Sequence, residues 1–328
     1  MPLIKESTAT LRPDLTQALI EYDDAGATAK FIGEQILVPH PVPTKTGEFP
    51  IFKRENFLET PETHREPGGG YNRSALELDS RTFACETHGL EQTVDDEDAV
   101  NYARYLSLEA AAARTRYFQM LVAFERAVAT TMATITAGGN AAVKWSTIAS
   151  STPLADIQTY ADVICDAAGC SRADLTLIVS ETDLRYLRTA AAILDVIKYT
   201  NPGVSAESVT EQILTGYFGV KQILVGKGAY NTAGRNITPS MSRMWASGTA
   251  YLALLADGES TPLEMPCVGR SMLWTERGNP AGRLNLGVET YREEKVEGTV
   301  VRVKHSFDLV LQQAVGTDLF VQSIDVDP

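Results

Sequence analysis

A long run of helix-forming residues, LEAAAARTRYFQMLVAFERAVATTMAT, is the feature that most constrains how this chain can fold. Ser107 precedes it as a helix cap, and Gly138 and Gly139 follow it as termination signals. We predict a helix from Leu108 to about Thr134, about 40 Å long. Alanine fills its first turns and its apolar stripe is narrow, which predicts a strut lying across a sheet. The stripe contains Phe118, Leu121, Val122, Val128 and Met132.

Residues 36 to 92 differ from this helix because they are rich in proline, charge and turn residues. Proline cannot donate to a strand ladder, so this segment is not a central sheet. We predict two antiparallel strands, Glu48 to Phe57 and Ser74 to Glu86, joined by a long tip from Leu58 to Arg73. A ribbon of this kind is marginal alone in water. We expect another subunit to cover its apolar side chains, which are Phe49, Ile51, Phe52 and Phe57.

The segments on either side of the ribbon are simpler. Residues 1 to about 35 are weakly patterned and predict an extended arm, with one short helix around Leu15 to Tyr22, that needs a partner to be ordered. After the ribbon, the acidic run from Asp95 to Asp98 matches the start of a helix, with Thr93 as candidate cap. The helix dipole explains this run better than a cation site does.

Residues 150 to 235 predict a helix-rich α/β lobe. An amphipathic helix from Pro153 to Ala168 ends at Gly169, and the apolar runs LTLIVS and KQILVG read as buried strands. Later elements complete the pattern. We expect helices at 181–188 and 206–214, strands at 251–255 and 319–324, a connection at 267–274, and a hairpin pairing 287–294 with 299–307.

Composition excludes several classes of protein. The chain has 328 residues, of which 44% are hydrophobic and 22% charged, which is typical of a globular protein. Its formal net charge of −13 disfavours tight binding to nucleic acid, since that needs a basic surface. The N-terminal residues lack an apolar signal region and no window approaches a membrane span, so we expect a soluble intracellular protein.

The sequence gives little support for a catalytic site or a metal site. The four cysteines and four histidines fit no metal spacing, and the glycine runs lack the context of a phosphate loop. Glu125 falls on the apolar stripe of the long helix, where we expect a boundary position able to pair with an arginine. We therefore predict no enzyme, no cofactor and no metal site.

The order of arm, ribbon, strut helix and α/β lobe resembles the major capsid proteins of tailed bacteriophages, which have the Hong Kong 97-like fold. The segments that carry the likeness are GEFPIFKRENF, THGLEQTVDDEDAVNY, the long helix, CVGRSMLW and GTDLFVQSI. The resemblance implies an α+β fold with an N-terminal arm (1–35), an extended loop or β-ribbon (36–92), a peripheral domain with a spine helix (93–149 and 285–310) and an axial domain (150–284 and 311–328).

The same resemblance implies a subunit that assembles with itself as hexamers and pentamers into an icosahedral shell. That shell would be the virion capsid, assembled in the host cytoplasm, and would enclose double-stranded DNA without sequence-specific binding. A separate scaffolding protein, a portal and a decoration protein are the further partners implied. We take as candidate inter-subunit contacts the residues on and near the ribbon: Phe49, Ile51, Phe52, Lys53, Arg54, Phe57, Arg65 and Arg73.

Two other interpretations remain open. The same fold could form an encapsulin-like nanocompartment that encloses enzymes, and the order of elements cannot separate that use from a phage shell. A cytosolic α/β enzyme with its active site in residues 150–284 is a different class. It would need a nucleophile and a base, which the sequence does not indicate, and it would leave the ribbon unexplained.

Overall fold

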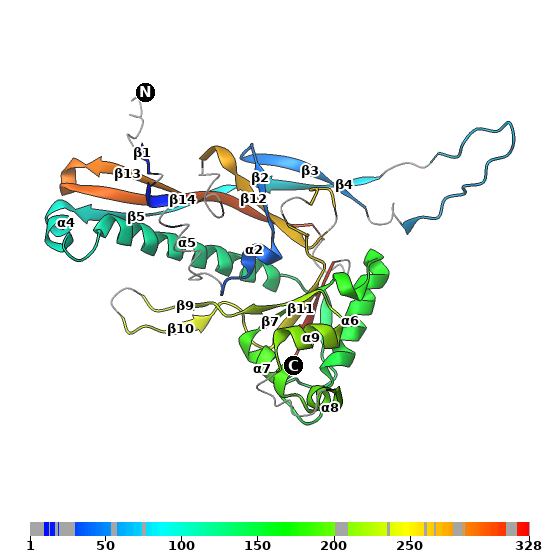
Figure 1. The fold of residues 1–328 in the computed structure, drawn as a ribbon. Coiled ribbons are helices and arrows are strands. Elements are labelled where there is room, and N and C mark those ends of the chain that lie inside the picture. Colours follow the sequence, from blue (N-terminus) through cyan, green and yellow to red (C-terminus); the bar gives the residue numbers. More distant parts are fainter. Residues whose placement is uncertain are drawn as a thin grey trace.

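The computed structural model describes residues 10–12, 14–16, 19, 30–53, 58–73, 77–200, 209–234, 237–258, 261–265, 267–277, 284, 286–312 and 320–327. They form two main sheets, one long helix and a group of shorter helices (Figure 1). The predicted α+β class is therefore confirmed. In this part of the chain no helix is both long enough and apolar enough to cross a membrane.

The first sheet is six-stranded and is organised around one long central strand, β14 (Gly298–Leu311). β13 (Gly287–Glu293) and β12 (Gly269–Trp274) pair with it antiparallel, and β5 (Glu86–Asp95) pairs along it from Gly298 to Phe307. The short strands β1 (Thr10–Leu11) and β2 (Pro39–Val42) pair with β13 and β12. The predicted hairpin of 287–294 with 299–307 is confirmed.

The long helix α5 (Leu108–Ala133) lies along one face of this sheet (Figure 1). Ser107 caps it, because its hydroxyl accepts the N–H of Ala110 at 3.3 Å. This confirms the predicted strut and its start. The side chains facing the core are Ala112, Ala113, Tyr117, Met120, Leu121, Phe124, Glu125, Val128 and Met132. Phe118 and Val122 from the predicted stripe are partly buried beside them.

The second sheet forms the lobe, in the order β6 (Gly138–Asn140), β15 (Val321–Asp325), β11 (Thr249–Ala253), β7 (Thr176–Ser180) and β8 (Gln222–Gly226). Every residue of β7 is buried, as expected for a central strand. The surrounding helices are α6 (Pro153–Ala168), α7 (Glu181–Thr189), α8 (Ala191–Thr200) and α9 (Glu211–Phe218). Gly169 ends α6 in the left-handed conformation, with φ of 59°.

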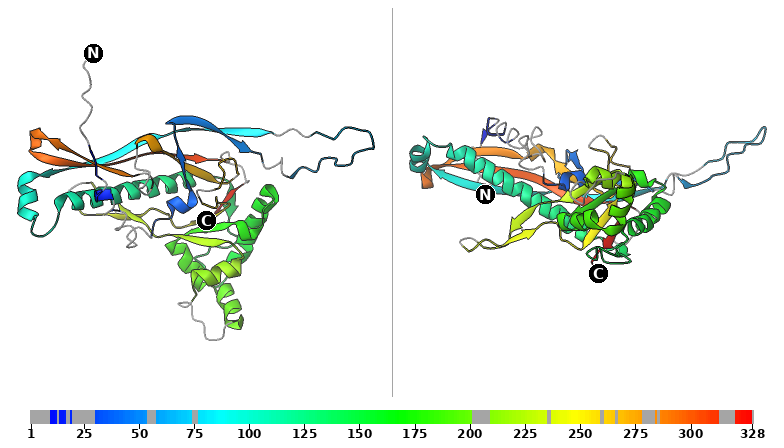
Figure 2. Two further views of the ribbon diagram at one scale, coloured as in Figure 1. Left: turned by 45° about the horizontal axis from the view of Figure 1, so that its top comes forward. Right: turned by 60° about the horizontal axis from the view of Figure 1, so that its bottom comes forward.

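The ribbon is formed by β3 (Thr46–Phe52) and β4 (Leu78–Ala84), which pair antiparallel from Thr46 with Ala84 to Phe52 with Leu78. The antiparallel pairing is as predicted, and residues 54–57 and 74–76 at the predicted ends of the two strands lie outside the described residues. The views in Figure 2 agree that the tip extends away from the rest of the molecule. All of the described residues 58–73 there are exposed.

Two further short elements flank the body. A helix, α4 (Asp96–Tyr102), follows β5 and is capped by Asp95, which accepts the N–H of Glu97 at 2.8 Å. Thr93 is therefore not the cap, since it lies inside β5 opposite Val300. A hairpin of β9 (Ala229–Asn231) and β10 (Met241–Arg243) projects beside α5 and was not predicted.

Several predicted boundaries differ from the structure. The segment 267–274, predicted as a connection, contains strand β12, and the helix expected at 206–214 is described as α9 at Glu211–Phe218. Leu15 and Leu19 are buried, whereas most of the predicted arm, like residues 201–208 and 313–319, lies outside the described residues. β12 pairs in the first sheet and β6 in the second.

A short N-terminal segment connects the two parts. Helix α2 (Gly33–Ile36) lies against α5 beside the lobe, and Phe31, Ile36 and Leu37 are buried there. The ring of Phe31 packs 5.6 Å from that of Phe118 on α5. One large hydrophobic cluster therefore runs through strut, first sheet and lobe, and a second, small one lies at the root of the ribbon.

Candidate functional site

The root of the ribbon belongs to the subunit's own core. Phe49 and Ile51 point inward from β3 and are only 4% and 5% exposed. The ring of Phe49 lies 6.4 Å from that of Phe83 across the strand pair. The expectation that Phe49 and Ile51 lack cover within the chain was therefore wrong, because other strands supply it. The rest of this small cluster is Val42, Cys85, Met272 and Val310.

A buried arginine organises the loop beside this root. Arg270 in β12 is 0% exposed, and its guanidinium donates to the carbonyl oxygens of Gly258, Thr261 and Pro262 at 3.4, 3.2 and 3.3 Å. A buried charge is costly unless hydrogen bonds satisfy it. The carbonyls therefore fix the loop over β12. In the same loop, the Glu264 carbonyl accepts the N–H of Phe52 on β3 at 3.2 Å.

Gln312 makes a second link between the same loop and the ribbon. Its side-chain oxygen accepts the N–H of Cys267 at 2.8 Å, and its amide nitrogen donates to the Leu263 carbonyl at 3.2 Å. Its own carbonyl accepts from Nε of Arg81 on β4 at 3.1 Å. Both strands of the ribbon are thus tied to the body at the point where they leave it. Sequence reasoning missed Arg270 and Gln312, although an arginine inside the apolar run VGRSML was a signal.

Beyond the root, the two strands are joined by charge. Lys53 pairs with Glu77 at 2.7 Å across the ribbon, and this hydrogen bond lowers the pKa of the Glu77 carboxyl. Lys53 is half-exposed on this outer part, as is Phe52 beside it. Arg54 and Phe57, the other candidates here, lie outside the described residues. The structure therefore gives no contact for them.

The tip, defined here as residues 58–73, is exposed at every position. It nevertheless has contacts of its own. Arg65 donates to the Gly69 carbonyl at 2.7 Å and its guanidinium lies 4.5 Å from the centre of the Tyr71 ring, while Asn72 donates to the Glu62 carbonyl at 2.7 Å. Tyr71 is 78% exposed and Arg73 is also exposed. The tip therefore presents an exposed aromatic and charged surface.

Glu125 forms a joint between three parts of the chain. It is 1% exposed, and its carboxylate accepts the N–H groups of Ile32 at 3.1 Å and Gly33 at 2.6 Å. It also accepts from the indole of Trp245 at 2.7 Å. The expectation of a boundary position paired with an arginine was wrong. The carboxylate instead connects α5, the segment before α2 and the lobe.

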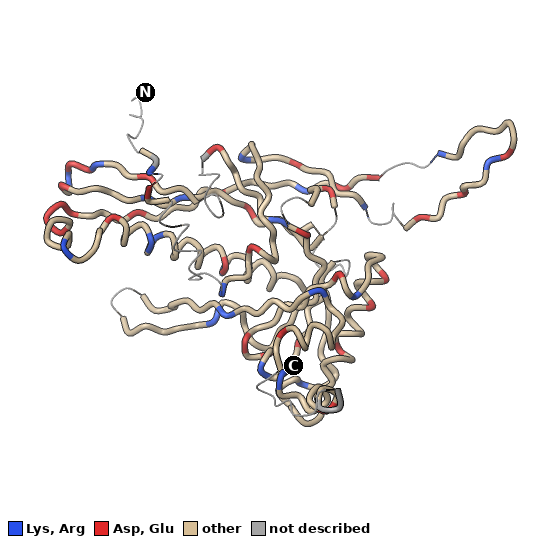
Figure 3. Tube along the Cα trace, in the orientation of Figure 1, with Lys and Arg blue, Asp and Glu red and all other residues tan. Residues whose placement is uncertain are grey.

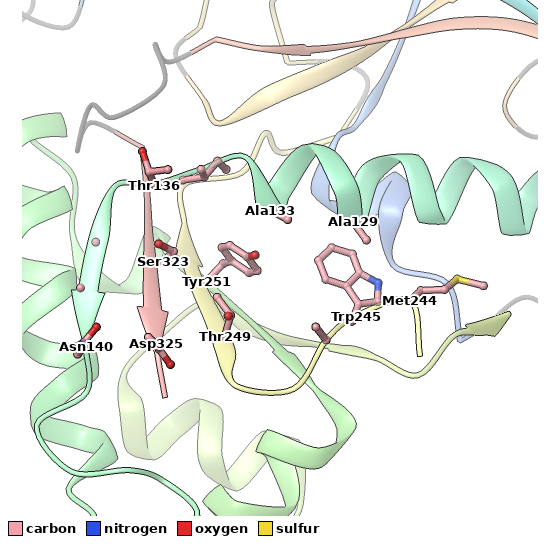
Figure 4. Close-up of a pocket in the computed structure, with 14 residues that line it drawn as sticks. Ala129, Ala133, Thr136, Asn140, Met244, Trp245, Thr249, Tyr251, Ser323 and Asp325 are labelled. Carbon is pink, nitrogen blue, oxygen red and sulfur yellow. The ribbon is translucent and has the colours of Figure 1, made fainter. Parts of the chain in front are cut away.

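A cavity of about 430 Å³ lies next to this joint, between the end of α5 and the edge of the lobe sheet (Figure 4). Trp245 and Tyr251 project into it, and its polar lining includes hydroxyl groups, the amide of Asn140 and the carboxylate of Asp325. Asp325 accepts the N–H of Asp327 at 3.2 Å. Burial raises the pKa of Tyr251. The cavity is a polar crevice between two parts of the fold. Its lining residues do not pair a nucleophile with a base.

Two other titratable side chains, His305 and Asp96, are engaged in packing or in an ion pair. His305 is buried between Phe124 and Phe307, with ring centres 6.5 and 4.7 Å away, and burial lowers its pKa to about 3. Asp96 in the acidic run pairs with Arg292 at 2.7 Å. Over the described ranges, no three His, Cys, Asp or Glu side chains gather where they could hold a metal ion.

Acidic and basic residues are mixed along the described part of the chain. Figure 3 shows acidic and basic residues interspersed along the ribbon, the first sheet and the lobe. The acidic residues among them are therefore not confined to one segment.

Comparison with known proteins identifies the fold. No family model and no curated protein sequence matches the chain. A phage-related protein from Bordetella bronchiseptica RB50 matches with a TM-score of 0.68 at 18% identity, over 97% of this chain and 98% of that one. The capsid of cyanophage P-SCSP1u matches with a TM-score of 0.58 at 10% identity, over 90% and 88%. The chain has the Hong Kong 97-like capsid fold.

The capsid fold is not confined to phages among the matched structures. A virus-like particle from Pyrococcus furiosus matches with a TM-score of 0.51 at 10% identity, over 95% of this chain and 98% of that one. The resemblance read from the order of elements is confirmed at the level of the fold. The division into named domains and the candidate contact residues stay predictions.

Proposed function

We propose that this chain is the major capsid protein of a tailed bacteriophage. Copies of it assemble as hexamers and pentamers into the icosahedral shell of the virion, in the host cytoplasm. The observation that carries this proposal is the ribbon: an exposed tip, firmly anchored at its root, on a chain with the capsid fold.

The anchorage explains why the tip is suited to contact a neighbour. A flexible loop loses conformational entropy when it binds, whereas a segment held in shape loses less. The pairing of β3 with β4, the Lys53–Glu77 ion pair and the Arg65–Tyr71 contact hold the ribbon extended before it meets a partner. A protrusion that fits a different surface on a second copy makes a heterologous contact, and such contacts close into rings.

The charge of the chain supports enclosure of DNA without tight binding. With a net charge of −13 and mixed surface charge, the shell wall would repel packaged phosphates. We propose that the shell encloses double-stranded DNA without reading its sequence. A separate scaffolding protein, a portal and a decoration protein are further proposed partners. In this proposal the chain is structural and not an enzyme.

An encapsulin-like nanocompartment is the second candidate, and the likeness to the virus-like particle from Pyrococcus furiosus favours it. The two functions differ in their contents. Shells purified after expression with the neighbouring reading frames should contain nuclease-protected DNA if the chain serves a phage. An enclosed enzyme in place of DNA would contradict the phage proposal and support the nanocompartment.

Negative-stain electron microscopy with sedimentation tests self-assembly itself. The proposal predicts closed shells, or rings of five and six subunits, from the chain alone or with a scaffolding partner. A homogeneous monomer under all these conditions would contradict it. A turnover assay that a single polar mutation abolishes would then favour an enzyme.

A further inference from the structure

Two cysteines meet at the corner where α6 ends. Cys165 lies in the last turn of the helix, Gly169 turns the chain in the left-handed conformation, and Cys170 follows directly. The Gly169 N–H donates to the Cys165 carbonyl at 2.8 Å, which brings the two side chains to the same side. Their sulfur atoms are 3.9 Å apart, and both residues are partly exposed.

We propose that Cys165 and Cys170 are a modification site that forms an intramolecular disulfide when the protein meets a disulfide oxidant such as oxidised glutathione. A disulfide requires the sulfurs to approach to about 2.05 Å. Side-chain rotation at two partly exposed positions can provide that approach. The bond closes a ring across the end of α6.

Access favours these two cysteines over the others. Cys170 lines a cavity of about 480 Å³ between this corner and the loop after β11. Cys85 is 1% exposed and donates to the Met272 carbonyl, and Cys267 is 2% exposed and donates to the Gly269 carbonyl. Cys267 borders the same cavity, so a bond between Cys170 and Cys267 is the competing product.

The reaction balances as two thiol–disulfide exchanges. The thiolate of Cys170 attacks one sulfur of the oxidant, forms a mixed disulfide and releases one thiol. The thiolate of Cys165 then attacks the Cys170 sulfur and releases the second thiol. Two cysteine thiols are thus oxidised, one oxidant disulfide is reduced to two thiols, and the two cysteine protons end on the released thiols.

The environment of Cys165 makes this bond slow to form and slow to reduce. Burial raises the pKa of the Cys165 thiol to about 12, with Cys170 adding to the shift. Little thiolate is present at neutral pH, so closure should accelerate as pH rises. Catalytic disulfides have a stabilised thiolate. This pair lacks that feature and fits a lasting bond.

The corner also supports the ribbon. A Cβ atom placed on Gly169 would lie 2.5 Å from Cδ2 of Leu58, so the first residue of the tip rests on this turn. A disulfide would hold the turn rigid under Leu58. If the proposed function is correct, the corner is reduced in the host cytoplasm and becomes locked in particles released from it.

The test uses unassembled subunit treated with oxidised glutathione or with dithiothreitol, so that it does not depend on shell formation. Trypsin separates the cysteines cleanly, because residues 145–172 form one peptide that contains both Cys165 and Cys170. Cys85 and Cys267 fall on the peptides 82–104 and 244–270. Mass spectrometry without reduction should show the 145–172 peptide lighter by two hydrogens, with the other two peptides unchanged.

The controls separate the alternatives. C85S and C267S should still lose the two hydrogens, and C170S should not. The oxidised wild type should melt about 2–4 °C higher than the reduced form, and C165S should show no such shift. A stable glutathione adduct on Cys170, a linked pair of the 145–172 and 244–270 peptides, or persistence of all four thiols would overturn the proposal.

Discussion

At the scale of single residues, this chain connects its parts through buried polar side chains with several partners. Glu125 accepts three N–H groups from segments far away in the sequence, and Arg270 donates to three carbonyls of the loop 8–12 residues before it. Removing one member of such a set leaves the others buried without a partner, which costs more than the hydrogen bond itself contributes. These positions should therefore be sensitive to conservative changes.

Glu125→Gln should destabilise the subunit by about 2–3 kcal/mol, because the amide presents N–H groups where the carboxylate accepts three. Denaturant unfolding of the unassembled subunit measures this. Glu109→Gln on the same helix is the matched control, since that side chain is partly exposed, and we expect less than about 0.5 kcal/mol. Equal effects of the two changes would contradict the role of Glu125 as a joint.

His305 should make the subunit sensitive to acid. Burial lowers its pKa from about 6.5 to about 3, so between these values the unfolded chain binds a proton that the folded chain does not. Stability is then complete above about pH 6.5 and falls by up to about 1.4 kcal/mol for each pH unit below it. Urea midpoints between pH 7 and 4.5 should show this slope. His305→Phe should flatten it, whereas His64→Gln in the exposed tip should leave it nearly unchanged.

At the scale of elements, nearby residues determine where the helices begin and end. Which side chains become buried depends instead on segments that are distant in the sequence. Ser107 and Gly169 mark the ends of α5 and α6 as their sequence context predicts. Phe49 was placed correctly on a strand, but the expectation that its own chain leaves it uncovered was wrong, because Phe83, Met272 and Val310 that cover it come from far along the chain. The pattern of one strand cannot reveal which other strands will meet it.

The turn at Gly169 should be intolerant of a side chain. Gly169→Ala should cost about 1–2 kcal/mol, because φ is 59° and the new Cβ would lie 2.5 Å from Leu58. Gly216→Ala inside α9 is the matched control, since nothing lies within 4 Å of its Cβ position. It should stabilise by about 0.5–1 kcal/mol. Thermal unfolding of both variants gives the comparison, and destabilisation of similar size in each would refute the geometry.

The two ends of the ribbon should respond differently to mutation. Phe49→Ala should cost about 3–5 kcal/mol of subunit stability, because the ring lies in a packed cluster. Tyr71→Ser should change it by less than about 0.5 kcal/mol, because the ring is 78% exposed. Sedimentation should show fewer assembled particles for Tyr71→Ser and wild-type levels for Tyr71→Phe, which keeps the ring. Normal assembly of Tyr71→Ser would remove the tip from the proposed contacts.

At the scale of the whole molecule, the order of elements was enough to predict the class of fold, and the connections between elements were not. The strut, the ribbon and the lobe each have a local signature. The segment that forms β12 was predicted as a connection, and only the loop carbonyls around Arg270 explain a charge inside a sheet. The joint at Glu125 likewise depends on Gly33 and Trp245, which no local pattern brings together.

The most direct test of the central claim is photocrosslinking from the ribbon tip in assembled protein. Tyr71 would be replaced by p-benzoylphenylalanine, the protein sedimented, and the particle fraction irradiated and separated on a denaturing gel. A shell subunit whose tip lies on a neighbour should give particles and a crosslinked dimer whose second site lies on another copy. A monomer that never sediments, or particles whose tip crosslinks only within its own chain, would contradict it.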